Sequence, residues 1–245
     1  MNKQGPLLTL GLLPNDLLSL FPEHTIFITS EFENDRWKVE TVSYRDGMQN
    51  FIGPTRDYRG ETFILDKNEN RYHLLRGSLP VFPEYNHIEK DEKTQKVIMD
   101  KTTKFKVMPK FDGSLFNLTY IPGDIFSGIF NNNGVSCAKG RLFFGSKNRF
   151  HAGQDMYDRI VKSILGSYET VEKFINHVAN FICKYNLENT SVTLHFEAIH
   201  GEPSEELSVV YDKPMCPFLG YTVFTDIAKT FKLPMGCDFP CALLS

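Results

Sequence analysis

Short segments in which apolar and polar residues alternate run through most of this sequence, and they constrain the fold more than any other feature. A period of two is typical of a strand that buries one face. It occurs in Trp37–Tyr44 and Val192–Ile199, and turn residues such as Lys67–Asn70 separate the segments. Further strands are expected at 61–66, 105–108, 115–121, 141–145, 207–211 and 220–224. The pattern favours a protein built mainly from antiparallel sheet.

Helical periodicity is concentrated in one region. Apolar residues at helical spacing, beginning with Val171 and Phe174, predict a helix over Ser167–Tyr185 with Ser167 as its N-cap. A shorter helix is expected over Asp155–Leu165. Mostly antiparallel strands with helices packed on them define the α+β class. We expect residues 1–245 to form a single domain whose part over 1–95 is β-rich.

Composition excludes several classes of protein. The formal net charge of −3 argues against electrostatic capture of nucleic acid by the whole chain, although it leaves room for a local basic cleft. Five cysteines without a C-x-x-C pair predict a reduced, intracellular, cytoplasmic protein and no zinc site. No apolar run reaches the roughly 18 residues of a membrane span. The short run Leu7–Leu13 is interpreted as a core segment and not as a secretion signal.

The sharpest local motif is Lys110-Phe-Asp-Gly113. A lysine becomes a nucleophile when desolvation and neighbouring cations lower its pKa, and an acid-glycine turn holding Asp112 would aim the amine at an electrophile. By itself the tetrapeptide is weak evidence, because K-x-D-G arises by chance in about one chain in twenty of this length. On the tetrapeptide alone, a polar hairpin turn with a solvated lysine is the better explanation.

Three other features could carry chemistry. In Val192–Ile199 the alternation places His195 and Glu197 on the face opposite the core, where a carboxylate could bind a ribose hydroxyl or a metal ion. We interpret His195 as a satisfied or solvated histidine. The clusters Arg59-Gly60 and Ser146–Arg149 could bind phosphate or could be ordinary surface. The P-loop, dinucleotide-binding, nucleophile-elbow and zincin motifs are all absent from the sequence.

The order of these features resembles the covalent nucleotidyltransferases, and in particular the phage RNA ligase 1 family. Val107–Ile121 resembles the family's active-site segment, in which the lysine is followed by an acid, Gly-Ser-Leu and Thr-Tyr. Phe144–Lys147 resembles the next motif, a Ser-Lys at the end of an aromatic strand, and Thr193–Ile199 resembles the third. Upstream, Tyr58–Gly60 resembles the arginine-glycine strand before the lysine. The similarity covers about residues 55 to 225.

The resemblance implies an antiparallel-sheet nucleotidyltransferase domain, an ATP-grasp-like ligase fold, with ATP between the sheets and the lysine core over 96–245. It implies that Lys110 attacks the α-phosphate of ATP, with Mg²⁺ neutralising phosphate charge. AMP then passes to the 5′-phosphate of an RNA end, tRNA among the candidates, and a 3′-hydroxyl seals the strand. It further implies a nucleotide site in which Arg59 meets the triphosphate, Lys147 lies near the nucleotide, Glu197 contacts the ribose, and Asp112 and Gly113 form the turn.

The sequence also departs from the family. A glutamate-glycine motif and a lysine-x-lysine strand should follow the third motif, but Gly201-Glu202 has the reversed order. Lys229 and Lys232 are separated by two residues instead of one, in a segment expected to be helical. A lysine expected before Tyr85 is replaced by Pro83. We therefore expect a domain that lacks its C-terminal strands and is poor at ligation. If the protein is an active ligase, a companion chain could supply the missing motifs.

Three alternatives stay open. The first is a truncated, catalytically impaired relative that only binds nucleotide or RNA. The second is a capping-type or DNA-ligase-type nucleotidyltransferase, since K-x-D-G is shared among these enzymes. The third is an unrelated α+β binding domain with a coincidental tetrapeptide. A resemblance to a phage family allows a viral or phage origin, and none of these hypotheses places the protein in a membrane.

Overall fold

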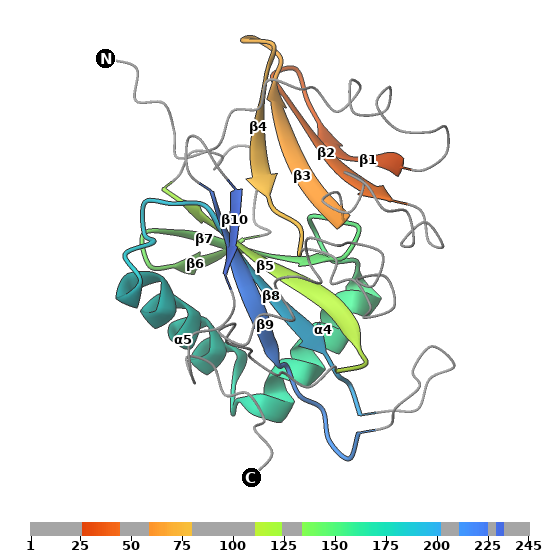
Figure 1. The fold of residues 1–245 in the computed structure, drawn as a ribbon, viewed down its shortest axis with the longest axis vertical. Helices are drawn as coiled ribbons and strands as arrows, with labels where there is room; N and C mark the ends of the chain where they lie inside the picture. Colours follow the sequence, from red (N-terminus) through yellow and green to blue (C-terminus); the bar gives the residue numbers. More distant parts are fainter. Residues whose placement is uncertain are drawn as a thin grey trace, which may run out of the picture.

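The computed structural model describes residues 26–44, 59–79, 111–123, 134–201, 211–224 and 229–232 (Figure 1). Within these ranges the chain forms two antiparallel sheets and two helices. The expected α+β organisation with antiparallel sheet is therefore confirmed.

The first sheet contains β1 (Ile26–Glu33), β2 (Trp37–Tyr44), β3 (Arg59–Asp66) and β4 (Arg71–Arg76), paired in that order. The strands expected at 37–44 and 61–66 are confirmed, and β3 begins two residues earlier than expected. The turn at 67–70 is confirmed as well. The sequence interpretation missed β1 and β4.

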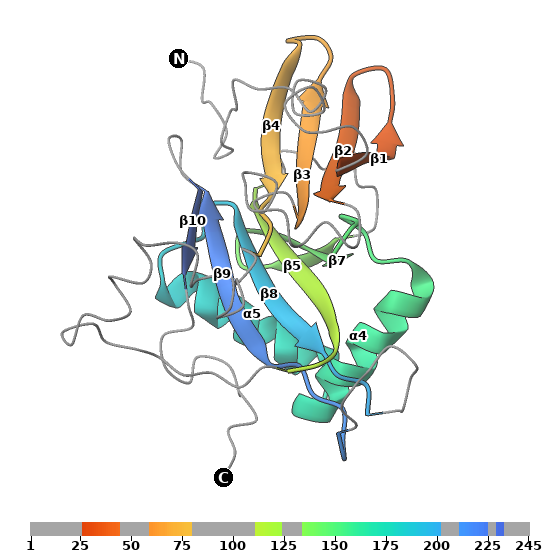
Figure 2. The same cartoon turned by 45° about the vertical axis from the view of Figure 1, so that its right-hand side comes forward.

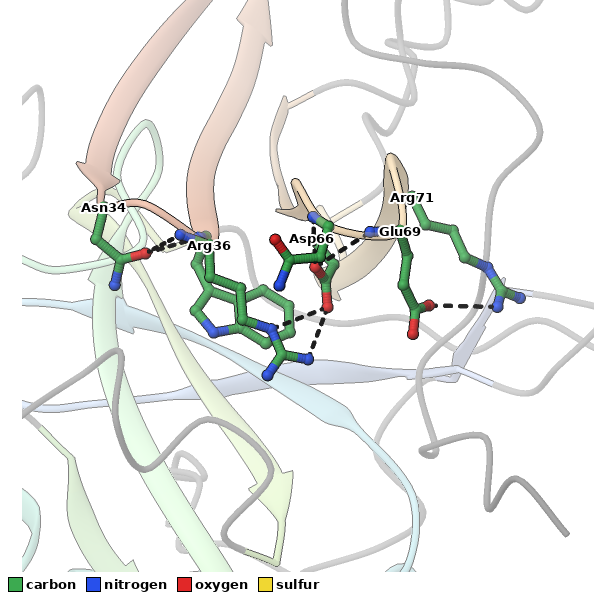
Figure 3. A network of polar contacts seen from close by, with 7 residues as sticks. Asn34, Arg36, Asp66, Glu69 and Arg71 are labelled. Carbon is green, nitrogen blue, oxygen red and sulfur yellow. Dashed lines mark hydrogen bonds and ion pairs between the residues drawn. The ribbon is translucent and has the colours of Figure 1, made fainter.

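Polar contacts join the turn between β1 and β2 to the turn between β3 and β4, beside Asp66 at the end of β3 (Figure 3). Arg36 donates from Nε and Nη2 to one carboxylate oxygen of Asp66, at 3.2 and 2.9 Å. The other oxygen of Asp66 accepts from the backbone of Asn68 at 2.9 Å. In the first turn, the side chain of Asn34 accepts from the backbone of Arg36 and of Trp37. Both oxygens of Asp66 are thus used to hold turns, which makes this cluster structural.

The second sheet has the strand order β10-β9-β8-β5-β7-β6. Its strands are β5 (Ser114–Pro122), β6 (Val135–Cys137), β7 (Gly140–Ser146), β8 (Val192–Ala198), β9 (Phe218–Phe224) and β10 (Lys229–Lys232). The strands expected at 115–121, 141–145, 192–199 and 220–224 are confirmed to within two residues. The helix expected around Lys229 and Lys232 is wrong, because these residues pair with β9 as a strand.

The two faces of the second sheet pack against different elements: one against the helices and the other against the first sheet. Val192, Leu194, Phe196 and Ala198 belong to the main apolar core, beneath the helices, as the alternation predicts. The opposite face meets the first sheet, where Ile121, Phe143 and Phe150 pack against Val39, Ile64 and Leu75. The helices lie on the side of the second sheet away from the first sheet (Figures 1 and 2). The polar face of β8 is therefore enclosed between two sheets.

The helices are α4 (Gln154–Ser167) and α5 (Val171–Lys184). The first extends the helix expected over 155–165. The helix expected over Ser167–Tyr185 is confirmed as α5, but its expected start and its expected N-cap, Ser167, are wrong. Tyr168 is extended, with φ −132° and ψ 148°, and Thr170 caps α5 by accepting from the backbone of Lys173. Ser167 instead binds the backbone of Cys216. The side chain of Ser167, which the sequence predicted as the N-cap, is therefore engaged in a tertiary hydrogen bond to Cys216.

Several sequence expectations fall outside the described residues: the apolar run 7–13, the upstream segment 83–86, the strand at 105–108, Lys110 itself, and 207–210 of the strand expected at 207–211. Tyr211 is described and is not in a strand. Within the described ranges, neither helix is long and apolar enough to cross a membrane.

Candidate functional site

Three of the segments singled out in the sequence meet at one edge of the second sheet. This edge is formed by the ends of neighbouring strands and not by an outer strand. Strand β5 lies between β7 and β8, and it begins directly after Gly113. Ser114 pairs with Ala198, so Glu197 lies at this edge. Phe116 pairs with Ser146, which places the following residue, Lys147, at the same edge. The register of three neighbouring strands thus brings together residues that are up to 85 positions apart in the sequence.

The turn before β5 is held by two side chains. The backbone N–H of Gly113 donates to Oε1 of Glu197 at 3.1 Å, and the N–H of Asp112 donates to the hydroxyl of Tyr211 at 2.9 Å. Gly113 leaves no room for a side chain, because a Cβ would lie 2.7 Å from the carbonyl oxygen of Ala198. Consecutive amides often cradle a phosphate. Here side chains of the protein already accept from both amides, so neither of the two is left to bind an anion.

Strand β3 of the first sheet meets the Lys147 segment at Gly60. Gly60 has φ +88°, and a Cβ there would lie 1.8 Å from the carbonyl oxygen of Lys147. Only glycine fits both the backbone conformation and the contact. Arg59 begins β3, and its backbone pairs with Ser43. The two basic clusters of the sequence are therefore neighbours, although nothing is described of the Arg59 side chain.

A buried arginine fixes this contact between the sheets. Arg76, fully buried, donates from Nε to the carbonyl of Gly60 at 2.8 Å. Its Nη1 donates to the carbonyls of Ser146 at 3.0 Å and Arg149 at 2.5 Å. Burial lowers the pKa of Arg76 to about 10, against the opposing effect of the Glu31 and Glu61 carboxylates. The guanidinium therefore stays charged at neutral pH while its donors hold main-chain carbonyls.

Glu31 completes the hold on the segment 146–151. Its Oε1 accepts from the backbone of Phe150 at 2.5 Å and its Oε2 from His151 at 3.1 Å. The hydroxyl of Thr41 also donates to Oε1, at 2.5 Å. Arg76 thus satisfies carbonyls and Glu31 satisfies amides of one short segment. We call these two residues the Arg76–Glu31 clamp.

His195 is a structural residue of the same interior. It is fully buried, and its Nδ1 and Nε2 lie 2.7 Å from Asn117 Oδ1 and 2.8 Å from Thr222 Oγ1. Because Asn117 Nδ2 donates to the carbonyl of Ser146 at 3.3 Å, its Oδ1 is left to accept from Nδ1–H. The interpretation of His195 as a satisfied side chain is confirmed.

The structure brings together four of the six predicted site residues: Asp112, Gly113, Lys147 and Glu197. Lys110 lies outside the described residues, and Arg59 is placed by its backbone only. Sequence reasoning missed Tyr211, Arg76 and Glu31. No local pattern marks them, because each acts on main-chain groups at least 70 residues away, apart from the bond of Arg76 to Gly60.

The described residues offer limited means to bind a metal. Among them, no three His, Cys, Asp or Glu side chains gather as ligands. If a magnesium ion bound at this edge, Asp112 and Glu197 would be its carboxylate ligands, since Mg²⁺ normally binds through one or two carboxylates. The three described cysteines are free, and burial raises the pKa of Cys137 and Cys216 to about 11. Both are neutral thiols at pH 7.

No family model matches the sequence, and a search of curated proteins finds no match.

Proposed function

We propose that this protein is a covalent nucleotidyltransferase of the RNA ligase type, which forms a lysyl-AMP intermediate on Lys110 from ATP. The observation that carries the proposal is the hydrogen bond from the Gly113 amide to Glu197, 84 residues away. It links the segment that resembles the family's active-site motif to the one that resembles its third motif. A coincidental tetrapeptide predicts no such contact.

The chemistry follows from the lysine. Once the Lys110 ammonium has lost a proton to solvent, the nitrogen lone pair attacks the α-phosphorus of ATP and forms a P–N bond. The bond from the α-phosphorus to the bridging oxygen breaks, and its electron pair leaves with pyrophosphate. In this proposal Arg59 binds the triphosphate, Lys147 lies near the nucleotide and Glu197 binds the ribose. A bound magnesium ion would neutralise phosphate charge.

The later steps would transfer AMP to the 5′-phosphate of an RNA end and seal it with a 3′-hydroxyl. One observation favours the impaired relative for these steps. The lysines of the family's last motif are two apart and share a face of a strand, whereas positions 229 and 232 of β10 are three apart and belong to opposite faces. Losing one electrostatic donor to the reacting phosphate costs about 10²–10³ in rate. We infer weak ligation unless a companion chain supplies the missing lysines.

The test is adduct formation with labelled ATP and Mg²⁺, followed by denaturing electrophoresis. The proposal expects a labelled band in the wild-type chain and in Lys173→Ala, an exposed lysine on α5, and no band in Lys110→Ala. A folded wild-type chain that gives no band refutes the enzyme. If that chain still binds ATP in equilibrium dialysis, the non-catalytic relative is favoured. A band with GTP alone would indicate capping chemistry.

A further inference from the structure

Residues 211–217 run beside the end of β8 and are bound to it by main-chain hydrogen bonds. Ile199 and Met215 exchange two of them, at 3.0 and 2.9 Å, and the amide of Glu197 donates to the carbonyl of Pro217 at 3.0 Å. This segment is therefore bound directly to the end of the strand that carries Glu197. We refer to it as the 211–217 strap.

The end of α4 holds the strap from a second direction. The amide of Cys216 donates to the Ser167 hydroxyl at 3.0 Å. Gly166 lies so close to Pro214 that a Cβ on Gly166 would be 2.1 Å from the Pro214 carbonyl oxygen. Contacts on β8 and on α4 thus hold residues 214–217 of the strap, and Tyr211 lies three residues before Pro214.

Tyr211 reaches from this strap to the predicted active-site turn. Its hydroxyl oxygen accepts the Asp112 amide, directly beside the amide of Gly113 that Glu197 accepts. Two successive peptide units of the turn are therefore held from two elements that are themselves bound together. Lys110 is two residues before Asp112 in the sequence.

We propose that Tyr211 is a positioning residue for formation of the lysyl-AMP bond. The proposal rests on the proposed function and adds to it the device that orients the nucleophile. Attack on the α-phosphorus needs the nitrogen in line with the departing pyrophosphate oxygen, and displacement by about 1 Å can cost about 10² in rate. By holding the Asp112 amide, Tyr211 restricts the turn to the orientation from which Lys110 reacts. It touches neither ATP nor the reacting atoms in this role.

The test compares Tyr211→Phe with Tyr157→Phe in single-turnover adduct formation. Phenylalanine keeps the ring and removes the acceptor. Tyr157 is a matched control because it is 38% exposed on α4 and no hydrogen bond of its hydroxyl is found within the described residues. We expect Tyr211→Phe to lower the rate at saturating ATP about five- to tenfold, the effect of one lost hydrogen bond. The ATP concentration at half-maximal rate should stay within twofold, and Tyr157→Phe should match the wild type.

A second measurement reads the bond itself. Amide hydrogen exchange at Asp112 should be faster in Tyr211→Phe than in the wild type and unchanged in Tyr157→Phe. Gly166→Ala, which displaces the strap, should also slow adduct formation, whereas Gly153→Ala should not, since a Cβ there meets no atom within 4 Å.

The outcomes distinguish a failure of the positioning role of Tyr211 from a failure of the proposed nucleotidyltransferase function. An absence of adduct in the folded wild-type chain refutes the proposed function and this role with it. Normal adduct formation by Tyr211→Phe, or unchanged exchange at Asp112, refutes only the role of Tyr211. A slower rate that is fully accounted for by a smaller folded fraction in thermal melts also overturns it, because a merely structural residue gives that result.

Discussion

Replacing Arg76 should destabilise the protein more than replacing any exposed arginine. Arg76→Met keeps most of the side-chain volume but removes three hydrogen bonds, which leaves the carbonyls of Gly60, Ser146 and Arg149 without this donor. It also removes the positive charge that faces Glu31 and Glu61. Removing one partner from a buried charged network typically costs about 3–5 kcal/mol. For a chain of this size that lowers the melting temperature by about 6–20 °C.

The assay is urea and thermal unfolding followed by circular dichroism, with Arg71→Met as the control. Arg71 lies on the same strand, with 38% of its side chain exposed and a 3.8 Å ion pair to Glu69 that is worth at most about 1 kcal/mol. Arg76→Lys should fall between wild type and Arg76→Met, because lysine keeps the charge but has one donor nitrogen in place of the separate Nε and Nη1 that bind these carbonyls. If Arg76→Met melts within about 2 °C of the wild type, the burial cost of the charge cancels its hydrogen bonds, and the clamp contributes no net stability.

Three further changes test other parts of the structure. Gly60→Ala combines a φ of +88° with a contact of 1.8 Å to the Lys147 carbonyl, so it should cost about 3 kcal/mol or more in urea unfolding, and Gly153→Ala should cost far less. Burial alone would raise the pKa of Asp66, but hydrogen bonds from Arg36 and two backbone amides lower it below the usual value. A lowered folded-state pKa stabilises the protein above the unfolded pKa of about 3.9, so the loss in Asp66→Asn, measured by urea unfolding, should be full at pH 7 and shrink as the pH falls below about 4. Thr170→Ala removes the N-cap of α5 and should cost about 1 kcal/mol in thermal unfolding by circular dichroism; no change would mean that packing alone defines the helix start.

The strands that could be predicted are those whose own residues alternate. In β8 the side chains alternate between the helix-covered core and the interface with the first sheet, and the period of two reports that directly. Strand β10 could not be found in this way. Its four residues, Lys229–Lys232, form a strand by pairing with the edge of β9, and a four-residue segment has too little pattern of its own.

The start of α5 was predicted at the wrong residue for a different reason. Thr170 is a good N-cap residue immediately before the apolar periodicity, so a signal for the break was present in the sequence. Ser167 is an equally good cap by residue type. The strap decides between them, since Ser167 accepts the amide of Cys216, and only Thr170 is left to cap α5.

In the candidate site, too, some features could be predicted from the sequence and others could not. The sequence by itself determined the α+β class, most of the described strands and the core face of β8, because local periodicity encodes these, and it singled out Asp112, Gly113, Lys147 and Glu197 as candidates. Only the tertiary structure decided that Glu197 binds the Gly113 amide, that Tyr211 holds the next peptide unit, and that Arg76 and Glu31 hold the Lys147 segment. The physical reason is that these side chains bind main-chain amides and carbonyls. Every residue except proline carries both groups, so no residue pattern in the sequence names the partner.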